Sequence, residues 1–125
     1  MQYIVESKKS VDEVVDAIQE KISEYKFGIL HIHEISNILK SKGLEFKNEC
    51  RVLEVCNPNY AKTLLDEDMK LAVILPCKIA VYTQEGKTNI SINSLTQLVD
   101  DINPDMLELA QEIQDTLLEL ISICR

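Results

Sequence analysis

A chain of 125 residues has the length of one domain, and 46% hydrophobic with 27% charged residues is the balance of a folded globular protein. The net charge of −8 disfavours anionic partners, so we expect neither nucleic-acid binding nor attachment to anionic membranes. Without a membrane-spanning apolar run, a signal peptide or the cysteine spacing of a disulfide framework, the sequence predicts a cytoplasmic protein with reduced thiols.

The first third of the chain alternates strand and helix signals. Residues 2–7 contain three consecutive β-forming side chains and predict a first strand. Ser10 and Glu13 have the spacing of a capping box, and the apolar residues that follow recur at helical spacing to about residue 25. Phe27 to Ile32 then predicts a second strand, and residues 35–42 predict a short helix before Gly43.

Prolines divide the middle of the chain into its elements. Residues 45–56 predict a longer strand, although its pattern does not assign the face that meets the core. Asn57-Pro58 predicts a helix start, with the asparagine as cap and proline in the first position, and the helix should end near Glu67. Pro76 cannot donate a hydrogen bond to a sheet, so the next strand is expected from Cys77 to Tyr82.

The last third predicts a hairpin followed by a long helix. Glu85-Gly86 forms the turn, and Thr88 to Ile92 alternates as its second strand. Asn103-Pro104 begins a helix that runs nearly to the C-terminus, and its apolar residues cover more of its circumference than one sheet face needs. This excess predicts a homodimer. Residues 1–125 are therefore expected to form a single α+β domain, with helices on one face of a four- or five-stranded antiparallel sheet.

Several short sequences resemble those of the domain of unknown function 302 family in order and spacing. They are Ile32-His33-Glu34-Ile35, Lys42-Gly43-Leu44, Glu54-Val55-Cys56-Asn57-Pro58, Leu75-Pro76-Cys77-Lys78, and Tyr82 followed by Gly86-Lys87-Thr88. The resemblance spans about residues 7–92. It implies a curved antiparallel sheet with helices on one face, in a TATA-binding-protein-like β-α-β(4)-α arrangement that often pairs as a dimer. It implies no activity.

His33, Cys56 and Cys77 are the candidate site residues. The two cysteines lie at proline-bounded strand ends, which antiparallel pairing would bring together, and His33 is expected to approach the same edge. Thiolates with an imidazole suit soft or borderline metals such as copper(I) or zinc. A thiolate activated by a neighbouring imidazole could instead serve redox or sulfur-transfer chemistry. Cysteine is also often a small buried hydrophobe, so a packing role stays open.

Three functions are consistent with these residues. The first is a dimeric binding or regulatory module that holds a soft metal, a sulfur ligand or another small molecule at His33, Cys56 and Cys77. The second is a thiol-based redox or sulfur-transfer protein that uses Cys56 and Cys77, and the third is a protein-interaction scaffold without a site. The chain contains neither a glycine-rich phosphate loop nor a nucleophile elbow, so its sequence predicts no particular enzymatic activity.

Overall fold

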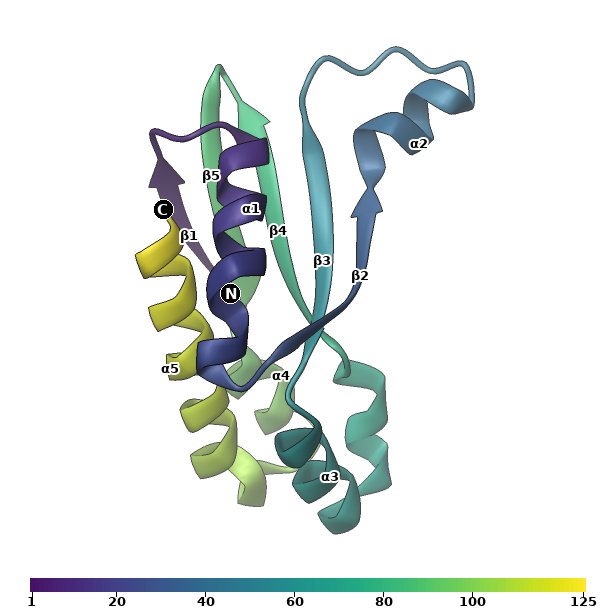
Figure 1. Ribbon diagram of the computed structural model, residues 1–125. Coiled ribbons are helices and arrows are strands. Elements are labelled where there is room, and N and C mark those ends of the chain that lie inside the picture. Colours follow the sequence, from purple (N-terminus) through teal and green to yellow (C-terminus); the bar gives the residue numbers. More distant parts are fainter.

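Five antiparallel strands form one open sheet in the computed structural model, which describes all residues from 1 to 125. The strands are β1 (Gln2–Ser7), β2 (Gly28–Glu34), β3 (Cys50–Cys56), β4 (Cys77–Gln84) and β5 (Lys87–Asn93). Their order across the sheet is β1-β5-β4-β3-β2, so β1 and β2 are the two edges (Figure 1). The predicted five-stranded version of the sheet is confirmed.

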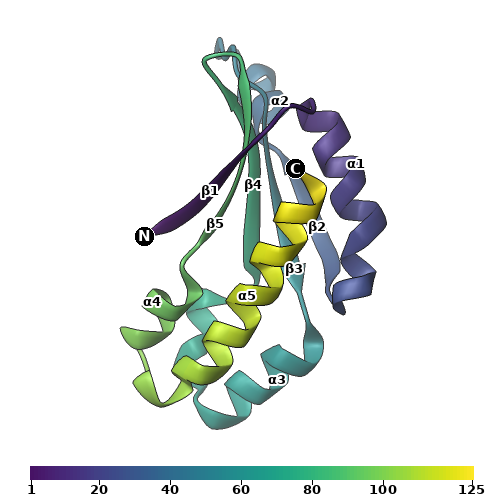
Figure 2. The same cartoon turned by 90° about the vertical axis from the view of Figure 1, so that its left-hand side faces the viewer.

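Five α-helices accompany the sheet: α1 (Val11–Lys21), α2 (Ile35–Ser41), α3 (Pro58–Glu67), α4 (Leu95–Asp100) and α5 (Leu107–Cys124). Three short 3₁₀ helices complete the fold: η1 (Ile22–Tyr25), η2 (Met69–Ile74) and η3 (Pro104–Met106). Figure 2 shows α1 and α5 on the same face of the sheet, with α3 and α4 beyond one end of it. This arrangement confirms the predicted α+β class with helices on one face. None of the helices combines the length and the apolarity that crossing a bilayer needs.

The predicted capping residues begin the helices. The Ser10 hydroxyl accepts a hydrogen bond from the Glu13 amide at 3.1 Å, and the Glu13 carboxylate accepts one from the Ser10 amide at 3.0 Å. The Asn57 side chain accepts from two amides in the first turn of α3. Asn103 caps η3, which leads directly into α5. Each cap satisfies amides that would otherwise have no partner within the helix, as the sequence predicts.

Two predicted strand boundaries are wrong. The strand β2 continues to Glu34, so His33 lies inside a strand and not at the entrance of a helix. The strand β3 begins only at Cys50, because the preceding residues form the loop that returns from α2. The face of β3 that meets the core carries Arg51, Leu53 and Val55, of which the last two are fully buried.

Two short elements, α4 and η2, were not predicted. The Ser94 hydroxyl accepts from the Gln97 amide at 3.3 Å, which is the cap that a Ser-x-x-Gln sequence offers, but six residues are too few for a clear helical period. The Asp68 carboxylate accepts from the Lys70 amide and starts η2 within an apolar run. Both elements lie at the end of the sheet where β4 begins (Figure 1).

The wide apolar surface of α5 is accounted for within one chain. The helix packs on the sheet, α1 and α4, which together bury Ile113, Leu117, Leu120 and Ile121. Ile123, which is 52% exposed, is the only large apolar side chain of α5 that faces solvent. The observation that suggested a homodimer is therefore explained by intramolecular packing, and self-association stays a prediction.

Candidate functional site

Cys56 and Cys77 lie at adjoining strand ends. Cys77, the first residue of β4, is the register partner of Val55, so it lies diagonally beside Cys56 at the end of β3. Both thiols are free, and both line a void of about 10 Å³, the size of a single water molecule. The proline-bounded turns thus bring the two cysteines together as predicted.

His33 lies elsewhere, and its predicted approach to the cysteines is wrong. Because β2 and β3 are antiparallel, Gly28 at the start of β2 pairs with Cys56, whereas His33 pairs with Val52. Cys56 is four positions after Val52 along β3, a distance of about 13 Å. No three His, Cys, Asp or Glu side chains in the chain are close enough together to hold a metal ion. The three candidate residues are therefore not assembled as one metal site.

His33 is instead part of a small polar group on the open face of the sheet. Its Nε2 lies 2.8 Å from a carboxylate oxygen of Glu54, and its ring meets that of His31 edge-on, with 4.3 Å between the ring centroids. Glu54 is also the register partner of Lys78, but the two side chains form no ion pair. The Glu54 carboxylate interacts with His33, and the Lys78 ammonium has no acidic partner.

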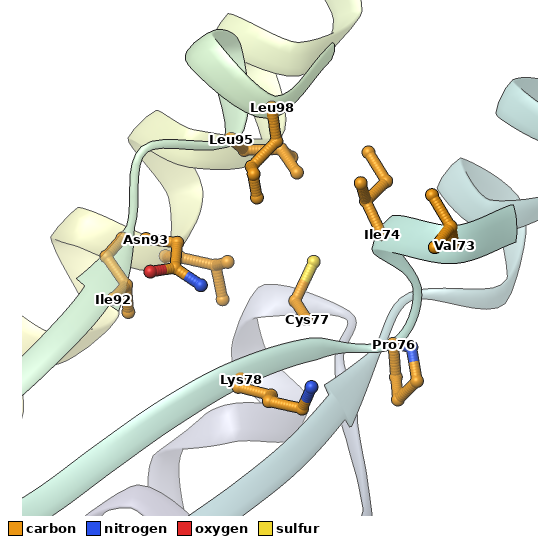
Figure 3. A pocket seen from close by; sticks show the side chains of 10 residues that line it. Val73, Ile74, Pro76, Cys77, Lys78, Ile92, Asn93, Leu95 and Leu98 are labelled. Atoms are coloured by element: carbon orange, nitrogen blue, oxygen red, sulfur yellow. The ribbon is translucent and has the colours of Figure 1, made fainter. Parts of the chain in front are cut away.

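The side chain of Cys77 points into a larger pocket of about 210 Å³ (Figure 3). Four elements supply its walls: η2, the start of β4, the segment from β5 into α4, and α5. The ten lining residues are Val73, Ile74, Pro76, Cys77, Lys78, Ile92, Asn93, Leu95, Leu98 and Leu117. Because η2 and α4 were not predicted, sequence reasoning found Cys77 but not the pocket around it. The signal that could have indicated α4 is the Ser94 cap.

Seven of the ten lining residues are hydrophobic, and the two polar ones lie on neighbouring strands. Lys78 and Asn93 are both exposed, and neither side chain makes a hydrogen bond or an ion pair within the protein. Figure 3 shows the Cys77 sulfur directed toward Ile74 and Leu98, and the Lys78 side chain on the other side of the β4 ribbon. An apolar cavity with a few polar groups on one side is the usual construction of a small-molecule site.

The thiol at the base of this pocket is neutral at physiological pH. Burial, together with the smaller effect of the nearby Cys56 thiol, raises the pKa of Cys77 from 9.0 to about 11. Nucleophilic attack and metal coordination both require the thiolate. Cys77 therefore contributes a small, weakly polar surface to the pocket.

The raised pKa of Cys77 predicts a specific loss of stability in alkali. Between about pH 9 and pH 11 the folded protein keeps the Cys77 thiol proton, whereas the unfolded chain loses it. The buried neutral thiol therefore contributes its full stability below pH 9, and this stability is lost as the pH rises through about 11. The expected loss is about 2–3 kcal/mol in the free energy of unfolding. Urea unfolding at pH 8 and pH 11 should show a smaller decline for Cys77→Ser than for the wild type. Equal declines would contradict the prediction.

Comparison with known proteins extends the resemblance to the domain of unknown function 302 family over nearly the whole chain. The family model for Domain of unknown function DUF302 matches residues 3–123. The chain is similar to the crystal structure of an uncharacterized conserved protein DUF302 from Bacillus stearothermophilus, with 33% sequence identity and a TM-score of 0.95. That similarity covers 99% of this chain and 98% of the other. No curated protein matches the chain.

Proposed function

Since this chain belongs to the DUF302 family and the membership assigns no activity, we propose a function from its pocket: a small binding module that holds a ligand with a compact apolar body over Cys77. The observation that carries the proposal is the pocket itself. A cavity of about 210 Å³ whose walls come from four separate elements is more than a packing defect between two of them.

The volume sets the size of the ligand. An apolar cavity of about 150 Å³ is large enough to bind benzene. A pocket of about 210 Å³ therefore fits a body of about six to eight carbon atoms. The mostly aliphatic wall favours a branched or cyclic hydrocarbon body, which would replace water in contact with Ile74, Leu95 and Leu98.

The chemistry of Cys77 favours this binding module over the two thiol-based hypotheses. A soft metal at Cys56 and Cys77 would lack the predicted His33 ligand and would have to deprotonate a thiol whose pKa is about 11. A redox or sulfur-transfer reaction would need the same thiolate. A neutral ligand site makes neither demand on the cysteine.

Titration with 4-methylpentanamide, a neutral six-carbon probe, tests the proposal by ¹H–¹⁵N NMR. We expect the amide signals of pocket residues such as Cys77 and Leu95 to shift in a saturable manner. Leu98→Trp should abolish these shifts, because the indole would fill the pocket from its half-buried position on α4. Leu118→Trp is the matched control, since Leu118 is also a half-buried helical leucine but does not line the pocket.

Well-dispersed spectra of both tryptophan variants establish that they are folded. Shifts that persist unchanged in a folded Leu98→Trp variant would place the probe elsewhere and contradict the proposal. An absence of saturable shifts in the wild-type protein would contradict it as well.

A further inference from the structure

The short helix α2 and the loop after it form an arm, residues 35–47, in which Ser36 is the only buried residue. We propose that this arm docks into an acidic groove on a second copy of the chain, and that two such contacts, related by a two-fold axis, join two copies into a dimer. The proposal is independent of the pocket over Cys77, which lies outside both surfaces.

The arm carries apolar side chains that the core of its own chain does not use. Ile38 and Leu44 are 45% and 56% exposed, and no apolar residue of the arm belongs to the core or packs against it. The five large apolar residues of the arm are Ile35, Ile38, Leu39, Leu44 and Phe46. Figure 1 shows α2 projecting beyond β2, away from α1 and α5. Apolar side chains gathered on a projecting element are typical of a surface that another molecule covers.

Hydrogen bonds hold the arm in one shape. Gly43 has a φ of +80°, and the Leu44 amide donates to the Leu39 carbonyl at 3.2 Å, which turns Leu44 back beside α2. At the base of the arm, the Ser36 hydroxyl donates to the Asn48 carbonyl at 2.9 Å. The arm therefore presents its exposed apolar side chains in a preformed arrangement, which lowers the entropic cost of docking.

The charge of the arm selects the kind of surface that it contacts. The arm contains three lysines, Lys40, Lys42 and Lys47, but only one acidic residue, Glu45, in a chain whose net charge is −8. None of these lysines forms an ion pair within the chain. A complementary surface is acidic and has apolar side chains of its own, and the same chain provides such a surface.

This surface is an open groove of about 360 Å³ between α3, η3 and the start of α5. Its apolar lining residues are Met106 and Leu109, both half-buried, and it contains no basic residue. Its acidic lining residues, none of which forms an ion pair, are Glu67, Asp105, Glu108 and Glu112. Glu112 accepts a hydrogen bond from the Tyr60 hydroxyl at 2.9 Å. The lysines of the arm would supply the missing counter-charge, while Ile38 and Leu44 cover the two apolar side chains.

The positions of the two surfaces make the contact reciprocal. Helix α2 lies at one end of the molecule, and α3 and the start of α5 lie at the other (Figure 1). Two copies side by side in opposite orientations therefore place each arm at the groove of the other copy. Because a two-fold axis occupies both arms and both grooves at once, the assembly stops at two copies.

Sedimentation of charge-reversed variants tests the proposal. At about 100 µM and low salt, we expect the wild-type protein to have twice the chain mass, and 0.5 M sodium chloride should shift it toward the monomer, because salt screens exposed charges. Lys40→Glu/Lys42→Glu reverses the arm, and Glu67→Lys/Glu108→Lys reverses the groove. Each variant alone should be monomeric, since arm and groove then carry the same charge. All four residues are exposed, so both variants should fold.

An equimolar mixture of the two variants should restore the dimer. The reversed arm then meets the reversed groove, and the native arm meets the native groove. The matched control is Lys8→Glu/Lys70→Glu, which makes the same change in net charge at two exposed lysines outside both surfaces and should leave the dimer intact.

Four results would overturn the proposal. They are a monomeric wild-type protein at low salt, a dimer that survives reversal of the arm or of the groove, a mixture of the two variants that stays monomeric, and equal dissociation of the control. Assemblies that grow beyond two copies with concentration would overturn the closed, reciprocal form of the contact.

Discussion

Cys77 should react with iodoacetamide about 100-fold more slowly in the native protein than in the chain unfolded in guanidinium. Alkylation consumes the thiolate, and a pKa of about 11 instead of 9.0 reduces the thiolate fraction at pH 8 by about two orders of magnitude. Enclosure in the pocket slows the reaction further. Mass spectrometry of timed samples gives the rate for each cysteine separately, so no substitution is needed.

The unfolded chain is the internal control for this measurement, because all four cysteines have ordinary environments there. Native Cys77 that reacts at the unfolded rate would contradict the neutral-thiol description. It would also revive the hypothesis of thiol-based redox or sulfur-transfer chemistry. A slow reaction that becomes slower still with 4-methylpentanamide present would connect the thiol directly to the occupied pocket.

Gln114→Ala should destabilise the protein by about 2–4 kcal/mol, although the side chain is polar. Gln114 is 2% exposed on α5, and its carbonyl oxygen accepts a hydrogen bond from the Thr96 amide at 3.1 Å. The hydroxyls of Ser94 and Thr96 lie 3.3 Å from the same oxygen, and the Gln114 amide donates to the Tyr3 hydroxyl at 3.3 Å. The substitution would leave the Thr96 amide and the Tyr3 hydroxyl without this partner, whereas the hydroxyls of Ser94 and Thr96 keep each other at 3.1 Å.

The same substitution should weaken ligand binding, because Gln114 fixes the start of α4, which carries Leu95 and Leu98 into the pocket. Urea unfolding measures the stability, and Gln111→Ala is the control. Gln111 is an exposed glutamine of the same helix whose amide donates to Asp115, so its removal should change stability by at most about 0.5 kcal/mol. Similar small losses in both variants would show that the buried network contributes little.

The parts of the fold that were predictable depend on local signals. Ser10, Asn57 and Asn103 begin helices through hydrogen bonds to residues two or three positions along the chain, and such bonds are encoded in short sequences. Pro76 likewise placed the start of β4 at Cys77. Predictions of this kind need no knowledge of what lies beside the segment in space.

The errors concern pairing between distant segments. His33 was expected beside the cysteines, but the register of β2 on β3 places Gly28 there instead. That register includes a shift between Ile29 and His31, which an alternating pattern of side chains does not reveal. The apolar circumference of α5, which suggested a second copy, is covered in part by α4, a helix that the sequence did not predict, and self-association itself stays a prediction.

The pocket could not be predicted for the same reason. Its lining residues come from positions 73 to 117, and most of them belong to apolar runs that look like ordinary core. Only the arrangement of η2, α4 and α5 around the start of β4 makes them the wall of a cavity (Figure 3). Cys77 was identified correctly as a notable residue, but its partners were expected to be metal ligands and are mainly leucine and isoleucine side chains.

A crystal structure of the protein grown with 4-methylpentanamide tests the central claim most directly, because it shows where the probe lies. We predict density for the hydrocarbon body between Ile74 and Leu98, in contact with the Cys77 sulfur. The same pocket should be empty of probe in crystals of Leu98→Trp grown under identical conditions. A wild-type structure in which the probe lies on another surface, or in which the pocket has closed around Cys77, would contradict the claim.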